Sequence, residues 1–224
     1  GRGAGGAGRG GGGAGGGWGT GDAGFVGGVG GMRVVRVDPS TWRVRVSGGA
    51  TWADVDRETQ AFGRAVPGGI VSTTGVAGLT LGGGQGWLRR TYGMASDSLV
   101  SADVVTASGD LLRASEADNA ELFWAIRGGG GNFGVVTAFE FETCPGGPMI
   151  AFAGPVYALE HAQAVMHGVR GFADGAPEEV NLSATWWSIP AVGAFPAELH
   201  GRPVIVVGAV YVGDPAVGEG AIAL

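Results

Sequence analysis

The sequence predicts an α+β fold, in which antiparallel strands are combined with helices and joined by glycine-rich loops. Residues 33–38 and 42–48 alternate apolar and polar side chains on either side of Pro-Ser-Thr, which is typical of a β-hairpin. A second hairpin is expected over residues 99–115, with its turn at Ser108-Gly109. The helical patterns lie outside these hairpins, so strands and helices do not follow the regular order of a parallel α/β fold.

Residues 51–63 are predicted to form a helix between the two hairpins. Thr51 is a favoured N-cap residue and Gly63 a typical residue for the helix end. Trp52, Val55 and Phe62 are expected on one side of this helix.

A G-x-G-x-x-G pattern occurs at Gly129, Gly131 and Gly134, but its surroundings do not fit a Rossmann nucleotide site. Such a site needs a strand before the glycines and a helix after them. Here residues 118–127 have the pattern of a helix, and residues 135–142 that of a strand. The predicted helix has Asp118 or Asn119 as its N-cap and Leu122, Phe123 and Ile126 as its apolar residues. A Walker A loop is also excluded, because no Gly-Lys-Ser/Thr follows any glycine run.

The run GGIVSTTGVAGLTLGGGQGWLRRTYG (residues 68–93) is the strongest functional signal in the chain. No buried helix or strand is expected in it, because glycine costs conformational entropy on ordering. Backbone N–H groups in such a loop can form a nest for phosphate oxygens, to which Thr73 and Thr74 would add hydroxyl donors. An irregular surface loop is the alternative. Two further glycine clusters, residues 8–17 and 127–136, favour an extended ligand such as a dinucleotide.

Residues 48–141, from GGATWADVDRETQAFG to FGVVTAFEF, resemble the FAD-binding (PCMH-type) domain of the vanillyl-alcohol oxidase superfamily. The resemblance is greatest to the berberine-bridge-enzyme-like FAD-linked oxidoreductases, and it continues more weakly to both sides. It implies a two-subdomain α+β domain that binds FAD, followed by the start of a substrate domain with an antiparallel sheet and helices. The expected division is a glycine-rich first part of the FAD domain (1–31), the FAD-binding domain (32–146) and a partial substrate domain (147–224).

The resemblance also implies which residues hold FAD. The first turn over the pyrophosphate would be Gly10, Gly11, Gly12 and Gly13. The central loop would contribute Thr73, Thr74, Gly75, Gly78, Leu79, Gly82, Gly83, Gly84, Gly86 and Trp87. Gly134 and Val136 would contact the opposite side of the cofactor. The alternative for Gly82 to Gly86 is tight packing between subdomains, and Trp87 could equally be a core residue.

The resemblance implies non-covalent attachment of FAD. Relatives often bind the flavin covalently through a histidine, and some also through a cysteine; these positions are Gly13 and Val71 here. The implied reaction is transfer of a hydride from a small organic substrate to the flavin and then to oxygen or another acceptor. The catalytic base is expected beyond Leu224, so no catalytic residue is assigned.

The first 31 residues are more than half glycine. Only Phe25, Val26 and Val29 are apolar where the family has a strand, so no stable strand is predicted there. In the substrate domain, residues 160–173 are expected to form an amphipathic helix, and 180–189 and 202–213 strands.

Composition excludes several other functions. The net charge of −6 argues against a nucleic-acid partner, and no apolar run is long enough to cross a membrane. A single cysteine, Cys144, rules out an internal disulfide, and a cytoplasmic location is slightly favoured. His161, His167 and His200 lack metal-ligand spacing. Of Trp186 and Trp187 on their predicted strand, one could face a substrate cavity, although sheet packing is the default.

Two alternatives to an FAD-dependent oxidoreductase remain open. The chain could be a flavin-fold remnant without activity, given Gly13 and the glycine-rich start. It could also be a glycine-rich binding protein with an RGG-like arm, although Arg2 and Arg9 are the only basic residues before Arg33.

Overall fold

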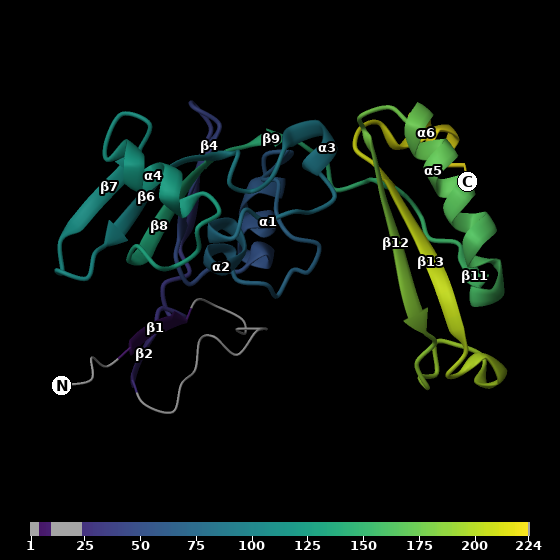
Figure 1. The fold of residues 1–224 in the computed structure, drawn as a ribbon. Coiled ribbons are helices and arrows are strands. Elements are labelled where there is room, and N and C mark those ends of the chain that lie inside the picture. Colours follow the sequence, from purple (N-terminus) through teal and green to yellow (C-terminus); the bar gives the residue numbers. More distant parts are fainter. Residues whose placement is uncertain (1–4, 10–23, 224) are drawn as a thin grey trace. The chain divides into compact units, whose positions relative to one another are not determined.

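The computed structural model describes residues 5–9 and 24–223 (Figure 1). The chain divides into two compact units, Gly1–Pro148 and Met149–Leu224. Helices and antiparallel sheets are present in both units, which confirms the predicted α+β class.

A five-stranded antiparallel sheet forms the centre of the first unit, with the strand order β3-β4-β8-β6-β7. Its strands are β3 (Val35–Asp38), β4 (Arg43–Ser47), β6 (Leu99–Val105), β7 (Leu111–Ser115) and β8 (Val135–Glu142). Both predicted hairpins and the predicted strand over 135–142 are confirmed. β8 pairs with β4 on one side and β6 on the other, so it joins the two hairpins into one sheet.

The two faces of this sheet differ in chemistry. On one face, inward side chains such as Val44, Val104, Phe139 and Phe141 form the main hydrophobic core. The other face carries charged side chains that pair across strands, including Arg113 with Glu140. This alternation is what a half-buried antiparallel sheet requires.

Helix α1 (Trp52–Gln60) confirms the predicted helix and packs on the core side of the sheet. Trp52 and Val55 are buried, and the Trp52 indole lies 6.2 Å from the Phe141 ring between centroids. The prediction for Phe62 is wrong: its side chain is 45% exposed. The reason is that the helix ends at Gln60, so Phe62 lies in the turn that follows and no longer follows the helical period.

Helix α4 (Ala120–Ile126) confirms the predicted helix before the second glycine cluster. Its N-cap is Asn119, one of the two predicted candidates, with the left-handed φ of +52° that asparagine tolerates. The Asn119 amide donates a hydrogen bond to the Arg113 carbonyl of β7 at 2.7 Å. Phe123 and Ile126 face the core.

The prediction that residues 68–93 contain no buried helix is wrong. This run contains two short helices, α2 (Val76–Leu81) and α3 (Arg89–Tyr92). The first forms because its six residues include only one glycine and bury Val76, Thr80 and Leu81 along one side.

A strand also occurs where none was predicted. β2 (Gly24–Gly28) pairs in parallel with β1 (Gly5–Arg9). The ladder of a β-sheet is made by backbone groups, which glycine supplies as well as any other residue except proline. A second small pair joins β5 (Arg64–Ala65) to β9 (Cys144–Pro145).

The second unit is built on a four-stranded sheet with β13 (Pro203–Tyr211) at its centre. β12 (Val180–Ser188) pairs along one side of β13, and β10 (Ala151–Ala153) and β11 (Val156–Ala158) pair along the other. The helical elements are η1 (Leu159–His161), α5 (Ala162–Gly175), η2 (Ala197–Leu199) and α6 (Pro215–Ala221). The predicted helix and both long strands are confirmed. The buried hydrophobic cluster of the second unit is small and consists of Ala151, Val180, Ala209 and Ile222.

Cys144 is the chain's only cysteine and is buried in β9. Burial raises the pKa of its thiol to about 11. A raised folded-state pKa gives stability that is complete below the unfolded pKa of about 8.5 and is lost as pH rises toward the folded value. Because the chain contains no lysine, few other groups titrate in this range.

We therefore expect the free energy of unfolding to fall by about 2 kcal/mol between pH 8 and 11 from this thiol alone. Urea unfolding at both pH values measures the change, with Cys144→Ala as the matched variant. All other groups are common to both proteins, so the difference between them isolates the thiol. An equal loss in both proteins would contradict this origin.

Candidate functional site

The first part of the central loop is fixed by the start of α1. The Trp52 N–H donates to the Thr74 carbonyl at 3.1 Å, and the Ala53 N–H donates to the Ser72 carbonyl at 2.9 Å. The loop thus provides the acceptors that the first turn of a helix otherwise lacks. These contacts leave the Thr73 side chain exposed and the Thr74 side chain half-buried.

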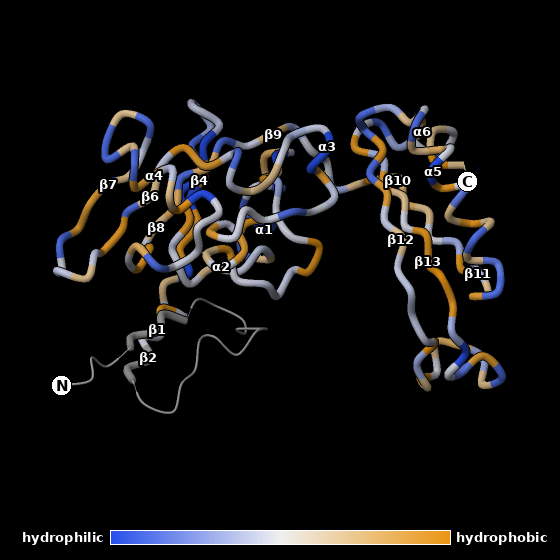
Figure 2. The backbone as a smooth tube through the Cα atoms, in the orientation of Figure 1, coloured by the Kyte–Doolittle hydropathy of each residue, from blue (hydrophilic) through white to orange (hydrophobic). Residues whose placement is uncertain are grey.

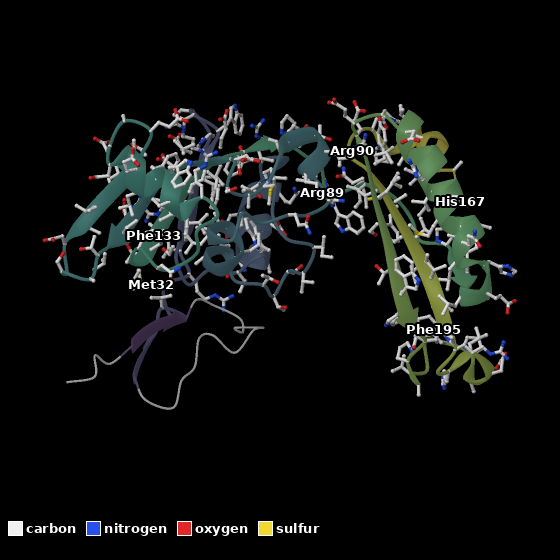
Figure 3. All side chains as sticks on the ribbon, viewed as in Figure 1. Met32, Arg89, Arg90, Phe133, His167 and Phe195 are labelled. Carbon is white, nitrogen blue, oxygen red and sulfur yellow. The ribbon has the colours of Figure 1, made fainter. Side chains whose placement is uncertain are left out.

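The end of α2 brings the two described glycine clusters together. The Leu81 carbonyl accepts hydrogen bonds from the N–H groups of Gly128 at 3.1 Å and Gly130 at 2.9 Å. On the same stretch, the Gly83 carbonyl accepts from the Ser96 N–H at 2.9 Å. Phe133, labelled in Figure 3, lies over Gly129, where an added Cβ would come within 2.8 Å of its ring. The loops around 82–84 and 128–133 therefore form one structural element.

Several of the predicted glycines are closely packed against protein atoms. A Cβ on Gly86 would lie 1.8 Å from the Gly68 carbonyl oxygen, and one on Gly134 would lie 2.5 Å from the Val105 carbonyl oxygen. Gly84 combines a φ of +75° with only 2.4 Å between an added Cβ and the Leu79 side chain. At these three positions, the packing of the protein by itself accounts for glycine.

Gly78 and Gly82 differ from these, because both are exposed and border open space. A Cβ on Gly78 would meet no described atom within 4 Å. A Cβ on Gly82 would meet only ordinary contacts at 3.5 and 3.6 Å. The packing of the protein therefore leaves room for a larger residue at either position. A cofactor lying against α2 would occupy that room and would require glycine there.

The remaining predicted residues are distributed as follows. Gly75 is buried in a bridge with Thr51, Leu79 and Trp87 are half-buried, and Gly83 is buried with a φ of +97°. The Val136 side chain is only 5% exposed and belongs to the core, so it could meet a cofactor only through its backbone. Gly10, Gly11, Gly12 and Gly13 lie outside the described residues.

The charges of the two loops fit a ligand that carries phosphates. Residues 68–93 contain Arg89 and Arg90 but no aspartate or glutamate, and residues 127–136 contain Arg127 and likewise no acidic residue. This is notable in a chain with a net charge of −6. A pyrophosphate at these loops would meet backbone donors and no carboxylate from the loops themselves; the Asp97 carboxylate, just beyond the first loop, is paired with Arg127.

Two buried polar atoms next to these loops have no hydrogen-bond partner among the described residues: Thr80 Oγ1 and Trp52 Nε1. The Trp52 indole also packs against the start of the loop. A Cβ on Gly68 would lie 2.5 Å from its ring, and a Cβ on Gly69 would lie 3.8 Å from its Nε1. Together with the open space at Gly78 and Gly82, these features fit a cofactor held mainly by backbone and shape.

An ion pair that was not predicted from the sequence holds the start of α1. The Asp54 carboxylate accepts from the Thr51 N–H at 2.9 Å and from Arg33 Nη2 at 2.7 Å. Burial alone would raise the Asp54 pKa, but the hydrogen bonds from Thr51 and Arg33 outweigh it and hold the pKa below its ordinary value. The Thr-x-x-Asp spacing of a capping box was the available signal for Asp54, while nothing in the sequence pointed to Arg33.

No metal site accompanies the loops: within residues 5–9 and 24–223, no group of three potential ligands is close enough to hold an ion. His161 is the N-cap residue of α5, and the His200 side chain hydrogen-bonds to a backbone carbonyl.

Among the described helices, none combines the length and apolarity that a membrane span needs. Asp97 accepts from the Met94 N–H at 2.8 Å, and Asp103 pairs with Arg45 across the outer sheet face, so both carboxylates have structural partners.

The known proteins that this chain resembles are FAD-binding proteins, in agreement with the chemistry of these loops. Residues 6–115 match the family described as "FAD binding domain". An FAD-linked oxidoreductase of Aspergillus terreus is 47% identical over 118 residues, which cover 53% of this chain and 24% of that protein. (R)-6-hydroxynicotine oxidase of Paenarthrobacter nicotinovorans is 42% identical over 111 residues, covering 50% of this chain and 24% of the oxidase. The chain thus spans about a quarter of the length of these relatives.

Solved structures give the same result for the fold. The chain resembles 6-hydroxy-D-nicotine oxidase from Arthrobacter nicotinovorans with a TM-score of 0.81 and 28% identity, over 97% of this chain and 47% of the oxidase. It resembles the berberine-bridge-enzyme-like protein #28 of Arabidopsis thaliana with a TM-score of 0.77 and 27% identity, over 90% and 40% of the two chains. The chain therefore carries an FAD-binding domain and belongs to the berberine-bridge-enzyme-like family of FAD-linked oxidoreductases.

Proposed function

We propose that this chain binds FAD non-covalently through its glycine loops and belongs to an enzyme that oxidises a small organic substrate. In that enzyme a hydride would leave the substrate carbon for the flavin, and molecular oxygen or another acceptor would take up the electrons. The observation that carries the proposal is the junction at Leu81, whose carbonyl joins two glycine loops from distant parts of the sequence. These loops are free of acidic residues and border open space at Gly78 and Gly82.

Different residues would contribute in different ways. The backbone N–H groups of Thr73 and Gly75, together with the Thr73 hydroxyl, would donate to the cofactor, because the contacts with α1 fix this part of the loop and the Thr74 N–H already donates to the Val71 carbonyl. Gly78, Leu79 and Gly82 would form the surface along which the cofactor lies. Gly83, Gly84, Gly86, Trp87, Gly134 and Val136 would shape the surrounding walls, and Gly10 to Gly13 would close over the pyrophosphate. Bound FAD supplies the two-electron acceptor; the protein supplies position and electrostatics.

Non-covalent attachment follows from side-chain chemistry. Val71 is 53% exposed on the loop and has no nucleophilic atom, and Gly13 has no side chain at all. The only thiol, Cys144, is buried in β9 and has a raised pKa, so it is a poor nucleophile. Retention of FAD must then depend entirely on hydrogen bonds and packing.

The visible absorbance spectrum of the purified chain tests the proposal. We expect flavin bands in the native protein, and free flavin in the supernatant after acid precipitation. Flavin that stays with the precipitate would contradict non-covalent attachment. A protein that remains colourless after incubation with FAD would contradict FAD binding and favour an inactive remnant.

A further inference from the structure

Two aromatic side chains of the second unit form a corner at the end of its sheet. The rings of Trp187, on β12, and Phe195, in the loop between β12 and β13, lie 5.6 Å apart between centroids at an interplanar angle of 71°. Trp187 remains 41% exposed and Phe195 is half-buried. Figure 3 shows Phe195 where β12 and β13 are joined.

The corner lies on the sheet face that α5 does not cover. Val180 and Leu182 of β12 pack in the cluster that includes Phe172 of α5. Because side chains alternate along a strand, Trp186 lies on that same face and Trp187 on the opposite one. Trp187 is directly opposite Val204, which is in turn paired with Ala158, so three uncharged strands continue the surface beside it.

The loop holds Phe195 in place. The His200 Nε2 lies 3.0 Å from the Phe195 carbonyl oxygen, and because a carbonyl can only accept, this nitrogen carries the hydrogen. The loop is closed by hydrogen bonds from the Ile189 N–H to the Arg202 carbonyl at 3.1 Å and from the Gly201 N–H to the Ile189 carbonyl at 2.8 Å. The two rings are therefore preorganised, which lowers the entropic cost of binding a ligand.

The chemistry of the surroundings indicates the ligand. None of the strands β10, β11, β12 and β13 contains an aspartate, glutamate, arginine or histidine. Figure 2 shows β13 largely in the hydrophobic colours. The charged residues nearest in sequence are Glu179, directly before β12, Glu198 in the loop between β12 and β13, and Arg202, directly before β13. An uncharged surface gives no compensation for desolvating a charged ligand.

We propose that Trp187 and Phe195 bind a neutral aromatic ring. A third ring can stack on one member of an edge-to-face pair while meeting the other edge-on. A sugar would need several polar partners for its hydroxyls, whereas the neighbours of Trp187 across the strands are Val204 and Ala158. If the ring is part of the oxidised substrate, as the proposed function would have it, the substrate is an uncharged aromatic compound.

Fluorine NMR titration of the full chain tests this binding directly, without FAD and without turnover. The probes are fluorobenzyl alcohol, fluorobenzoate as its charged counterpart, and fluoroglucose as a neutral sugar. Fluorobenzyl alcohol is expected to bind saturably and at least about tenfold more tightly than the other two. Trp187→Leu and Phe195→Leu, which keep apolar bulk but remove the rings, are expected to weaken it about tenfold.

Trp186→Leu is the matched control, because it removes the neighbouring and more exposed indole from the opposite face of β12. Its affinity for fluorobenzyl alcohol should stay within twofold of the wild type. The proposal is overturned by equal weakening in the control, by tighter binding of fluorobenzoate or fluoroglucose, or by the lack of saturable binding. None of these outcomes alters the flavin spectrum, so the failure of this inference is distinguishable from failure of the proposed function.

Discussion

Replacing Gly78 by leucine is expected to weaken FAD binding strongly while the fold is preserved. Gly78 lies inside α2, is exposed, and has no described atom within 4 Å of an added Cβ. A leucine there has room in the protein alone but extends into the space proposed for the cofactor. Leucine also has a higher helix propensity than glycine by about 0.8 kcal/mol, so stability should not fall.

The measurement is FAD affinity from quenching of flavin fluorescence, together with the thermal midpoint. We expect the dissociation constant to rise at least about tenfold, the cost of overpacking a site by a few methyl groups. Gly168→Leu is the control: Gly168 lies in α5 and likewise has open space around an added Cβ. This control should bind FAD like the wild type.

Gly86 provides a comparison, because there glycine is required by the packing of the protein itself. Gly86→Ala would place a Cβ 1.8 Å from the Gly68 carbonyl oxygen, so it should lower the thermal midpoint whether or not FAD is bound. Full affinity for FAD in Gly78→Leu would show that the cofactor does not lie against α2, and the proposed site would have to be moved.

Replacing Asp54 by asparagine is expected to lower the free energy of unfolding by about 3 kcal/mol at pH 7. The substitution removes the charged acceptor of the capping box and of Arg33, where the carboxylate is only 7% exposed. Loss of an N-terminal cap costs about 1 kcal/mol, and hydrogen bonds from charged groups contribute about 2 kcal/mol more. Urea denaturation at pH 7 measures the difference.

The pH dependence identifies the carboxylate as the cause. The Asp54 pKa is lowered in the folded protein, so its contribution is present above the unfolded pKa of about 3.9 and is lost as pH falls through the folded value. The gap between wild type and Asp54→Asn should therefore narrow below about pH 4. Glu58→Gln makes the same charge change on α1 but affects only an exposed pair with Arg57, so it should cost less than about 0.5 kcal/mol. A constant gap down to pH 3 would exclude an ionic origin.

The elements with strong local signals could be predicted from the sequence. The Pro-Ser-Thr and Ser108-Gly109 turns lie between strands whose apolar residues alternate, and Thr51 and Asn119 precede helices. These signals are local because turn and cap residues act on backbone groups within a few positions. Where local signals were weak, as at Val76–Leu81 and Gly24–Gly28, a helix and a strand were missed.

For the site, the sequence alone determined the chemical character: glycine-rich loops without acidic residues, non-nucleophilic residues at Gly13 and Val71, and a resemblance to a family that binds FAD. Only the tertiary structure decided which glycines are required by packing, as at Gly86, and which border open space, as at Gly78. It also decided that the Leu81 carbonyl joins two loops and that Arg33 reaches Asp54. These are contacts between residues far apart in the chain, and such contacts depend on how strands and helices pack, which no local pattern of residues encodes.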